Sequence, residues 1–331
     1  MTEKPIRVAV VGVGDFGRNH VRVYREMPGV TLVGITDINS DRAKAVAAEF
    51  STQALPDISA LAGNVDAVSL AVPTSEHARI GTRLLEQGID LLVEKPIAAS
   101  LEEADALIAA AQRSTRILQV GHLERFNPAI VAAEKIVTRP LFFEIHRLGV
   151  FSPRSLDVDV VYDLMIHDLD ILLALLDSPV TDLRAVGIPV MTDKVDIAHA
   201  RIEFASGAVA NLTASRVSTE KVRKMRFFQE HEYISLDFTR QDVLRVRVQP
   251  GTGLTHEAEP RVDFEKVPSE PEEPLRAELR AFLESVRTRR LPRVDGPAAR
   301  RALELADRVM AGILEHARRV QLGTFAPQGA R

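Results

Sequence analysis

The sequence contains no cysteine in its 331 residues, which excludes disulfide bonds, thiolate nucleophiles and cysteine metal sites and is consistent with a reducing compartment. Long apolar runs are also absent. The unbroken ones do not exceed the length of Ile171 to Leu176, whereas a helix that spans a bilayer needs about 20 apolar residues. An excess of one charge is missing as well, because the net charge is −4 and the positive residues are spread along the chain. These absences argue against a membrane protein and against a nucleic-acid-binding protein.

We therefore expect a cytoplasmic protein without a membrane or nucleic-acid partner. The first five residues lead directly into a strand-like run, so we expect no signal peptide. The length is sufficient for about two domains of the usual size, and we find no internal repeat that would suggest another arrangement.

Short runs rich in Val, Ile and Leu alternate with amphipathic stretches through the first 120 residues. The runs are typical of strands in a buried parallel sheet, and they cover residues 6–11, 31–36, 66–72, 89–93 and 116–120. The helical stretches cover residues 16–27, 40–50, 75–87 and 100–112, and three of them open on serine, a favoured N-cap residue. Ser100 and Glu103 have the spacing of a capping box, and Gly88 is placed to end the preceding helix. The alternation predicts an α/β Rossmann domain with a doubly wound parallel sheet.

Strand and hairpin patterns dominate the remainder of the chain. Strands are expected at residues 141–148, 198–204, 208–214, 227–238 and 243–248, and helices at 157–176, 274–289 and 297–320. Residues 252–274 are rich in Pro and Glu and are expected to form a loop or a sheet edge. We predict a Rossmann domain at 1–121, an α+β domain with a large, mostly antiparallel sheet at 122–320, and a flexible tail at 321–331.

A glycine-rich loop separates the first predicted strand from the first predicted helix. It consists of Gly12, Val13, Gly14, Asp15, Phe16 and Gly17. In dinucleotide-binding loops of this kind the first glycine permits a tight turn, the second lets the backbone approach a pyrophosphate, and the third lets helix and strand pack closely. The helix N-terminus then faces the phosphates. The alternative is a glycine-rich turn without a ligand.

An acidic residue, Asp37, ends the second predicted strand about 25 residues after Gly12. A carboxylate at this position can accept hydrogen bonds from the ribose hydroxyls and repel a 2′-phosphate, which favours NAD over NADP. Arg42 lies nearby and could hold that phosphate, or it could be an ordinary arginine on a helix surface.

Polar residues follow the ends of the other predicted parallel strands, where open α/β sheets bind their ligands. These candidates for cofactor contact are Pro73, Thr74, His77, Glu94, Lys95 and His122. Lys95 precedes Pro96, which favours an extended backbone and directs the lysine side chain away from the strand end.

Asp163 stands four residues before His167 in a helical pattern. Side chains at this spacing share a helix face, so the carboxylate can orient the imidazole and raise its basicity. The imidazole would then be a general base, because its pKa lies near neutrality. The other reading is a pair of helix residues that only stabilises the fold.

These motifs together resemble the Gfo/Idh/MocA oxidoreductase family. The stretches that carry the resemblance are residues 12–17, Asp37, residues 71–77, 94–96, 120–128 and 163–167. The resemblance implies an NAD(P)-dependent sugar or polyol dehydrogenase in which Lys95, Asp163 and His167 are the catalytic residues and the Lys95–Pro96 bond is often cis. Val160-Val161-Tyr162 replaces the glycines that usually precede the Asp-x-x-x-His helix, which affects the expected shape of the pocket.

Within the family, residues 121–128 and the chain length are similar to those of enzymes that oxidise C3 of UDP-N-acetylglucosamine. A nucleotide-sugar substrate needs cations for its diphosphate, and a guanidinium binds phosphate oxygens well. The expected substrate residues are Lys95, Arg125, Asn127, Arg147, Arg154, Tyr162, Asp163 and His167, with Arg216 as a further candidate arginine. We expect at least two of the four arginines to be ordinary solvated residues instead.

In the expected reaction His167 takes the hydroxyl proton, and Lys95 stabilises the developing oxyanion or takes the proton itself. No metal is expected, because His231, Glu230 and Glu232 lie on a predicted strand, where neighbouring side chains point to opposite faces. Two alternatives stay open: a dehydrogenase of a free sugar, inositol or dihydrodiol, and a non-catalytic NAD-binding regulatory protein. A homodimer or homotetramer through the second sheet is expected in each case.

Overall fold

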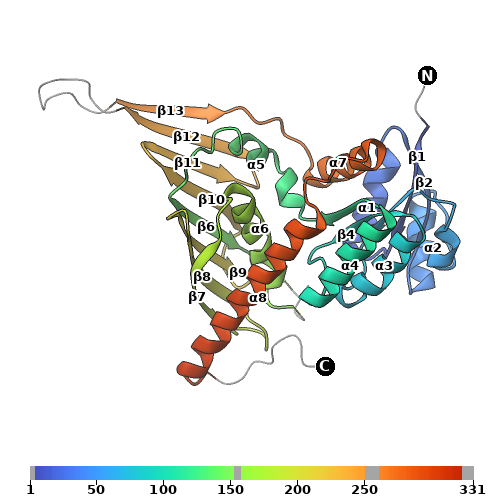
Figure 1. Ribbon diagram of the computed structural model, residues 1–331, viewed down its shortest axis with the longest axis horizontal. Helices are drawn as coiled ribbons and strands as arrows, with labels where there is room; N and C mark the ends of the chain where they lie inside the picture. The colour runs from blue at the N-terminus through green and yellow to red at the C-terminus, as the bar shows by residue number, and fades with distance from the viewer. Residues whose placement is uncertain (1–3, 153–157, 250–260, 323–331) are drawn as a thin grey trace, which may run out of the picture. The chain divides into compact units, whose positions relative to one another are not determined.

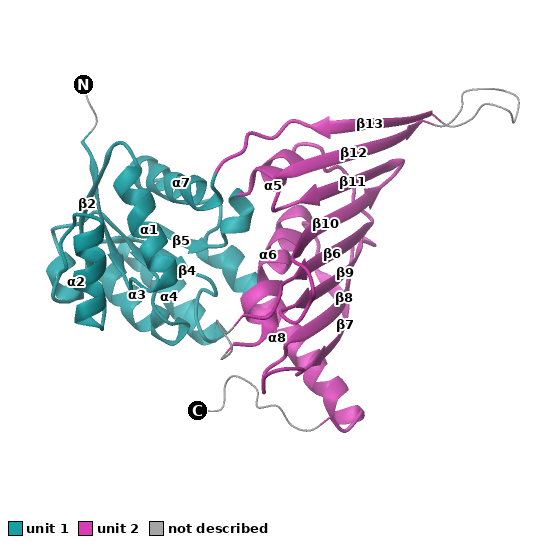
Figure 2. Ribbon diagram, turned by 180° about the vertical axis from the view of Figure 1, so that it is seen from behind, with its two compact units in different colours: residues 1–126, 273–303 teal, residues 127–272, 304–331 magenta. Residues whose placement is uncertain are grey.

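The computed structural model describes residues 4–152, 158–249 and 261–322. The chain forms two compact units, one made of Met1–Phe126 with Glu273–Leu303 and the other of Asn127–Glu272 with Glu304–Arg331 (Figure 2). The sequence patterns suggested a single boundary near residue 121, whereas a segment close to the C-terminus joins the first unit. An amphipathic helix shows that it has an apolar face but not which sheet that face will cover. The expected tail at 321–331 lies almost entirely outside the described residues.

The first unit contains a five-stranded parallel sheet in the order β2-β1-β3-β4-β5 (Figure 1). The strands are β1 (Ile6–Val11), β2 (Val30–Thr36), β3 (Ala67–Leu70), β4 (Asp90–Glu94) and β5 (Leu118–Gly121). Its helices are α1 (Asp15–Glu26), α2 (Ser40–Glu49), α3 (His77–Glu86), α4 (Leu101–Ser114) and α7 (Pro274–Thr288), with short 3₁₀ turns η1 (Ile58–Leu61), η2 (Thr74–Glu76) and η3 (Leu123–Phe126). The predicted doubly wound Rossmann sheet is confirmed, and the order of its strands reverses next to β1, where such sheets bind ligands.

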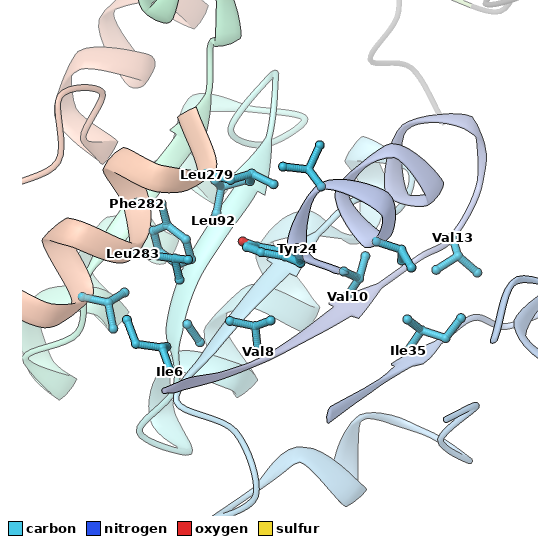
Figure 3. Close-up of a cluster of buried hydrophobic side chains, with 14 of the residues drawn as sticks. Ile6, Val8, Val10, Val13, Tyr24, Ile35, Leu92, Leu279, Phe282 and Leu283 are labelled. Atoms are coloured by element: carbon cyan, nitrogen blue, oxygen red, sulfur yellow. The ribbon is translucent and has the colours of Figure 1, made fainter. Parts of the chain in front are cut away.

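The core of this unit joins α7 to the parallel sheet. Figure 3 shows Tyr24 of α1 pointing toward Leu279 and Phe282 of α7, above Val8 and Val10 of β1. All of these side chains are fully or almost fully buried. Burial of a large apolar side chain contributes about 1.5–3 kcal/mol, so the buried face of α7 stabilises its packing in this unit.

The helix ends follow the expected cap chemistry with one correction. The Ser100 hydroxyl accepts a hydrogen bond from the Glu103 amide at 3.2 Å, and Gly88 takes a left-handed conformation (φ 80°) after α3. The second helix is capped by Asn39 and not by Ser40, since the Asn39 side chain accepts from the amides of the next turn. Asparagine and serine are equally good caps, so composition could not choose between the two neighbours.

The second unit contains an eight-stranded sheet in the order β13-β12-β11-β10-β6-β9-β8-β7, with helices on one face of it (Figure 1). The strands are β6 (Phe142–Leu148), β7 (Val180–Ile188), β8 (Ile197–Phe204), β9 (Val209–Ser215), β10 (Val222–Gln229), β11 (Glu232–Asp237), β12 (Asp242–Gln249) and β13 (Arg261–Val267). The helical segments are α5 (Pro128–Ala133), the π-helical turn η4 (Val161–Met165), α6 (Ile166–Leu175) and the later part of α8 (Gly296–Arg319). Neighbouring strands are antiparallel except β6 and β9, so the prediction of a large, mostly antiparallel sheet is confirmed.

Two details of this sheet differ from the sequence analysis. The stretch expected to be one strand at 227–238 is a hairpin, and Glu230 and His231 form its turn, with φ 59° at His231. This turn contains no Gly, Asn or Pro, so the sequence pattern predicted one continuous strand instead of two strands and a turn. The strand β7 was not predicted, because its alternating polar residues resemble a loop. Among the described helices, none combines the length and the apolar character that a bilayer span requires.

Candidate functional site

The glycine-rich loop has the backbone geometry that a dinucleotide requires. Gly12 adopts φ 83°, and a Cβ atom at Gly17 would lie only 1.8 Å from the Gly12 carbonyl oxygen, so α1 could not approach β1 with any other residue there. At Gly14 the nearest described atom to such a Cβ is Arg42 Nη1 at 3.7 Å, which leaves the backbone open. No side chain caps α1 in the described part of the chain, so its first amides can bind an anion. These features fit the pyrophosphate of a dinucleotide.

Asp37 connects this loop to the end of β2. Its carboxylate accepts hydrogen bonds from the Val13 amide at 2.9 Å and from the Asn39 amide at 2.8 Å. Arg42 Nη1 lies 3.7 Å from the same carboxylate and also faces Gly14. The half-exposed guanidinium of Arg42 thus lies beside the carboxylate that is predicted to face the ribose.

The end of β4 carries Lys95, which is half-buried and joined to Pro96 by a cis peptide bond, as the family resemblance implied. His77 lies beside it, with Nδ1 3.0 Å from the Pro96 carbonyl oxygen and Nε2 2.9 Å from the Val72 carbonyl oxygen. Burial lowers the pKa of His77, and the two carbonyls and Glu94 only partly offset this effect. A neutral imidazole has one N–H, so His77 donates to one of these two carbonyls while its ring lies between the chain after Lys95 and the end of β3. Its contact with the cofactor stays a prediction.

Glu94 and His122 are buried, with exposed fractions of 8% and 1%. Glu94 Oε1 lies 3.0 Å from Nε2 of His20, a residue that the sequence analysis did not single out. The available signal was its place three residues after Gly17 on the inner face of α1. Pro73 and Thr74, at the end of β3, are more accessible than these two residues.

In the second unit Asp163 and His167 lie on either side of a change in helix type. Asp163 is in the π-helical turn η4. His167, which is buried, is in the first turn of α6. The regular α-helical spacing assumed from the sequence is thus interrupted at the place where Val160-Val161-Tyr162 departs from the family pattern. Single π turns inside helices are frequent at functional sites, which agrees with a catalytic role for this pair.

Tyr162 anchors the same turn to α8. Its hydroxyl donates a hydrogen bond to the Asp307 carboxylate at 2.7 Å. Burial raises the pKa of Tyr162 above its usual range, and the bond to Asp307 raises it further. The phenol is therefore neutral and already occupied as a donor, so it holds η4 in place and is a weaker candidate for substrate contact than the sequence suggested.

The candidate substrate residues of the second unit divide into two groups. Arg147 is 3% exposed, and it donates to both carboxylate oxygens of Asp168, at 2.8 and 2.7 Å, below the Phe238 ring. Asn127 caps α5 and donates to the Phe238 carbonyl oxygen. Arg216 donates to the Val158 carbonyl oxygen and lies 3.7 Å from Asp196.

Side chains held in this way serve the fold, and a substrate contact of Arg147, Asn127 or Arg216 stays a prediction. Sequence reasoning missed the partners because a buried carboxylate such as Asp168 cannot be distinguished from a surface one by pattern. The remaining arginines are Arg125, a half-buried residue of η3 in the first unit, and Arg154, which lies outside the described residues.

We expect Arg147→Ala to lower the free energy of unfolding by about 3–5 kcal/mol, because it leaves the Asp168 carboxylate buried without its partner. Urea denaturation would measure this loss. The exposed Arg139 is a matched control, since Arg139→Ala should change stability by less than about 0.5 kcal/mol. Normal stability of the Arg147 variant together with a raised KM would instead assign Arg147 to substrate binding.

Two family models match the chain. Residues 6–122 match the oxidoreductase family with an NAD-binding Rossmann fold, Gfo/Idh/MocA, and residues 147–234 match the C-terminal domain of the same family. The first match covers the glycine loop, Asp37 and Lys95, and the second covers Asp163 and His167.

Similar proteins were found by sequence and by structure. UDP-N-acetylglucosamine 3-dehydrogenase of Acidithiobacillus ferrooxidans is 41% identical over 311 residues, which cover 93% of this chain and 97% of the relative. Its solved structure aligns with a TM-score of 0.86 over the same fractions of the two chains. The NAD⁺-dependent scyllo-inositol 2-dehydrogenase of Bacillus subtilis is 31% identical over 240 residues, covering 65% of this chain and 69% of that one. A levoglucosan dehydrogenase solved with NADH and L-sorbose shares the fold, with a TM-score of 0.83 at 18% identity over 95% of this chain and 98% of that one.

Proposed function

The chain belongs to the Gfo/Idh/MocA oxidoreductase family, and within it we propose that this protein oxidises C3 of UDP-N-acetylglucosamine to the 3-keto sugar with NAD as acceptor. The observation that carries the proposal is the 41% identity to the Acidithiobacillus enzyme over almost the full length of both chains. Retention of Lys95, Asp163 and His167 supports a catalytic protein over a regulatory one that only binds the cofactor. The test is reduction of NAD, followed by absorbance, with UDP-N-acetylglucosamine and with inositol as the comparison.

Each proposed catalytic residue has a separate role in the reaction. NAD, when bound, supplies a nicotinamide ring that accepts the hydride. His167 accepts the proton from the hydroxyl group, and Asp163 orients the imidazole and stabilises its charged form. Lys95 donates to the oxygen as it gains negative charge, which lowers the barrier because charge develops there in the transition state.

The proposed cofactor contacts are the loop residues 12–17, Asp37, Pro73, Thr74 and Lys95. In the described structure the loop presents open backbone at Gly14 and an uncapped helix N-terminus, and these fit a pyrophosphate. The Asp37 carboxylate fits a diol and opposes a phosphate. The protein is thus an NAD-binding oxidoreductase, and we propose that it discriminates against NADP through Asp37.

We expect Asp37→Ala to narrow the preference for NAD over NADP, because the substitution removes the repulsive carboxylate and leaves Arg42 to bind a 2′-phosphate. Fluorescence titration with NADH and NADPH measures the ratio of the two dissociation constants. The control is the Asp37→Ala, Arg42→Ala double variant, which should lose the gain in NADPH affinity. Equal affinity of the unmodified protein for the two cofactors would contradict the role given to Asp37.

The outer face of the second sheet supports a homo-oligomer, and we propose a dimer formed through it. A row of apolar side chains crosses five neighbouring strands in register: Phe142, Phe228, Tyr233, Val246 and Phe264. Phe264 is 73% exposed in the single chain, and a second copy of the same face would bury the row. Sedimentation equilibrium should give twice the chain mass for the protein and the monomer mass for Phe264→Lys, and a monomeric unmodified protein would refute the dimer.

A further inference from the structure

In the second unit, the loop between β7 and β8 is bonded to the residues that precede η4. The loop covers residues 189–196. Its last two residues, Val195 and Asp196, have no exposed surface, and the same is true of Asp159 and Val160 before η4. All four belong to one compact unit. Polar groups in such an interior are costly unless they are bonded, so the bonds that they make show what the contact holds in place.

The Asp196 carboxylate fixes the conformation of this loop. Its Oδ2 accepts hydrogen bonds from three successive amides, those of Val190, Met191 and Thr192, at 2.8, 2.7 and 2.8 Å. Its Oδ1 accepts a hydrogen bond from the Thr192 hydroxyl at 2.8 Å. The Asp196 amide donates to the Ile188 carbonyl oxygen at 3.1 Å and closes the loop. Hydrogen bonds to a carboxylate are about twice as strong as neutral ones, so the loop has one well-defined shape.

Val195 joins the loop to the segment before η4. Its amide donates to the Asp159 carboxylate at 2.8 Å, and its carbonyl oxygen accepts from the Val160 amide at 2.9 Å. The Asp159 carbonyl oxygen in turn accepts from the amides of Tyr162 and Asp163, both at 3.1 Å. Asp159 therefore connects the loop directly to the turn that contains Asp163.

Arg216, the residue that follows β9, makes a second connection. Its amide donates to the Asp196 carbonyl oxygen at 2.9 Å, and its Nε lies 3.7 Å from the Asp196 carboxylate. Its Nη2 donates to the Val158 carbonyl oxygen. The buried guanidinium thus links the loop carboxylate to the main chain just before η4.

The π-helical turn η4 requires such support from outside the helix. Single π turns are rare, and unusual backbone arrangements persist only when the surrounding structure over-determines them. Val195 and Arg216 bind the two residues on either side of Asp159, directly before the turn. Asp163 lies inside the turn and His167 follows it in α6, so the positions of both depend on where η4 begins.

We propose that Asp159, Asp196 and Arg216 are positioning residues for the proposed reaction. They fix the start of η4, and this keeps Asp163 and His167 in the geometry that proton transfer needs. None of the three touches the substrate in this role. The role rests on the proposed function, because Asp163 and His167 are the proposed catalytic pair.

Hydrogen exchange of the free protein, read by peptide mass spectrometry, tests the hold on η4. Asp196→Asn keeps an oxygen for the loop amides and replaces the one that faces Arg216, and Arg216→Met removes the guanidinium. Both should speed exchange in the peptide that covers residues 158–165 by at least about tenfold, because charge-assisted hydrogen bonds are lost. Val267→Ala is the control. It removes buried methyl groups of β13, at the opposite edge of the sheet from β7, and should lower Tm without changing exchange in this peptide.

Kinetics test whether the hold acts through the catalytic pair. Arg216→Met should lower kcat by about 10- to 100-fold and change KM less, because a displaced base slows the chemical step. Arg216→Lys should recover part of this loss, since it keeps a cationic donor. In a His167→Ala background, Arg216→Met should lower kcat by less than about twofold, because the group that it positions is already absent.

Exchange at the wild-type rate in residues 158–165 of both the Asp196 and the Arg216 variants would overturn the inference. A raised KM with an unchanged kcat for Arg216→Met would also overturn it and would assign Arg216 to substrate binding. The same holds for an equal loss of kcat with and without His167, which is the result expected of a residue that supports only the overall fold. The exchange measurement needs no substrate, so it decides the hold on η4 even if UDP-N-acetylglucosamine is not turned over.

Discussion

Replacement of Lys95 or of His167 by alanine is expected to lower kcat by about 10²- to 10⁴-fold, the usual cost of removing an oxyanion donor or a proton-transfer group. NADH affinity should stay within a few-fold of wild type in the His167 variant and fall less than kcat in the Lys95 variant, because Lys95 is one of several proposed cofactor contacts and neither substitution alters the glycine-rich loop or Asp37. Steady-state kinetics with NAD and the nucleotide sugar give kcat, and fluorescence titration gives the affinity. Asp163→Asn should have a smaller effect, since it retains the shape of the residue that orients the imidazole.

The matched control for these variants is Lys44→Ala, which removes an exposed lysine of α2 in the first unit and should leave kcat unchanged. Rates close to wild type in both the Lys95 and the His167 variants would refute the catalytic assignment. Loss of NADH binding in step with kcat would instead mean that the two residues act by holding the cofactor and not in the chemical step.

The second large effect concerns the substrate. Free N-acetylglucosamine should be oxidised with a kcat/KM at least about 10²-fold lower than that of UDP-N-acetylglucosamine, because charge-assisted hydrogen bonds to the diphosphate position the reacting carbon. Initial rates of NADH formation over a range of both sugars measure the ratio. Robust turnover of inositol or a free hexose, with none of the nucleotide sugar, would contradict this substrate and leave the dehydrogenase class intact.

Arg125, a half-buried residue of η3, is an arginine that we propose binds the diphosphate. If it contributes equally to the ground state and the transition state, Arg125→Ala should raise KM for the nucleotide sugar with little change in kcat. KM for the free sugar should not change, which makes that substrate the internal control. An equal rise in KM for both sugars would indicate a general effect on the pocket.

The secondary structure of the first unit could be predicted from the sequence for a physical reason. Strands buried on both faces, such as β1 and β4, are nearly continuous apolar runs, and the intervening helices carry cap residues close to their ends. The glycine-rich loop could also be predicted from the sequence, because the φ of 83° at Gly12 and the contact distance at Gly17 tolerate no side chain. Local constraints of this kind restrict which residue types can occupy a position, so they can be recognised in the sequence.

The parts that sequence reasoning missed depend on partners that are distant in the chain. Arg147 was expected at a diphosphate, and its pairing with Asp168 arises only when β6 packs against α6. Glu278 lies in a helix far beyond the Rossmann pattern, so its burial in the first unit could not be expected from spacing. The π turn at Asp163 is a third example, because no residue type specifies it.

The measurement that tests the central proposal most directly uses UDP-N-acetylglucosamine with deuterium on C3. Oxidation at that carbon predicts that the label appears on the reduced nicotinamide and that the rate of NADH formation falls if hydride transfer is rate-limiting. The same sugar labelled at C4 should transfer no deuterium. Formation of NADH without label from the C3-deuterated substrate, or with label from the C4-deuterated one, would contradict the proposed reaction.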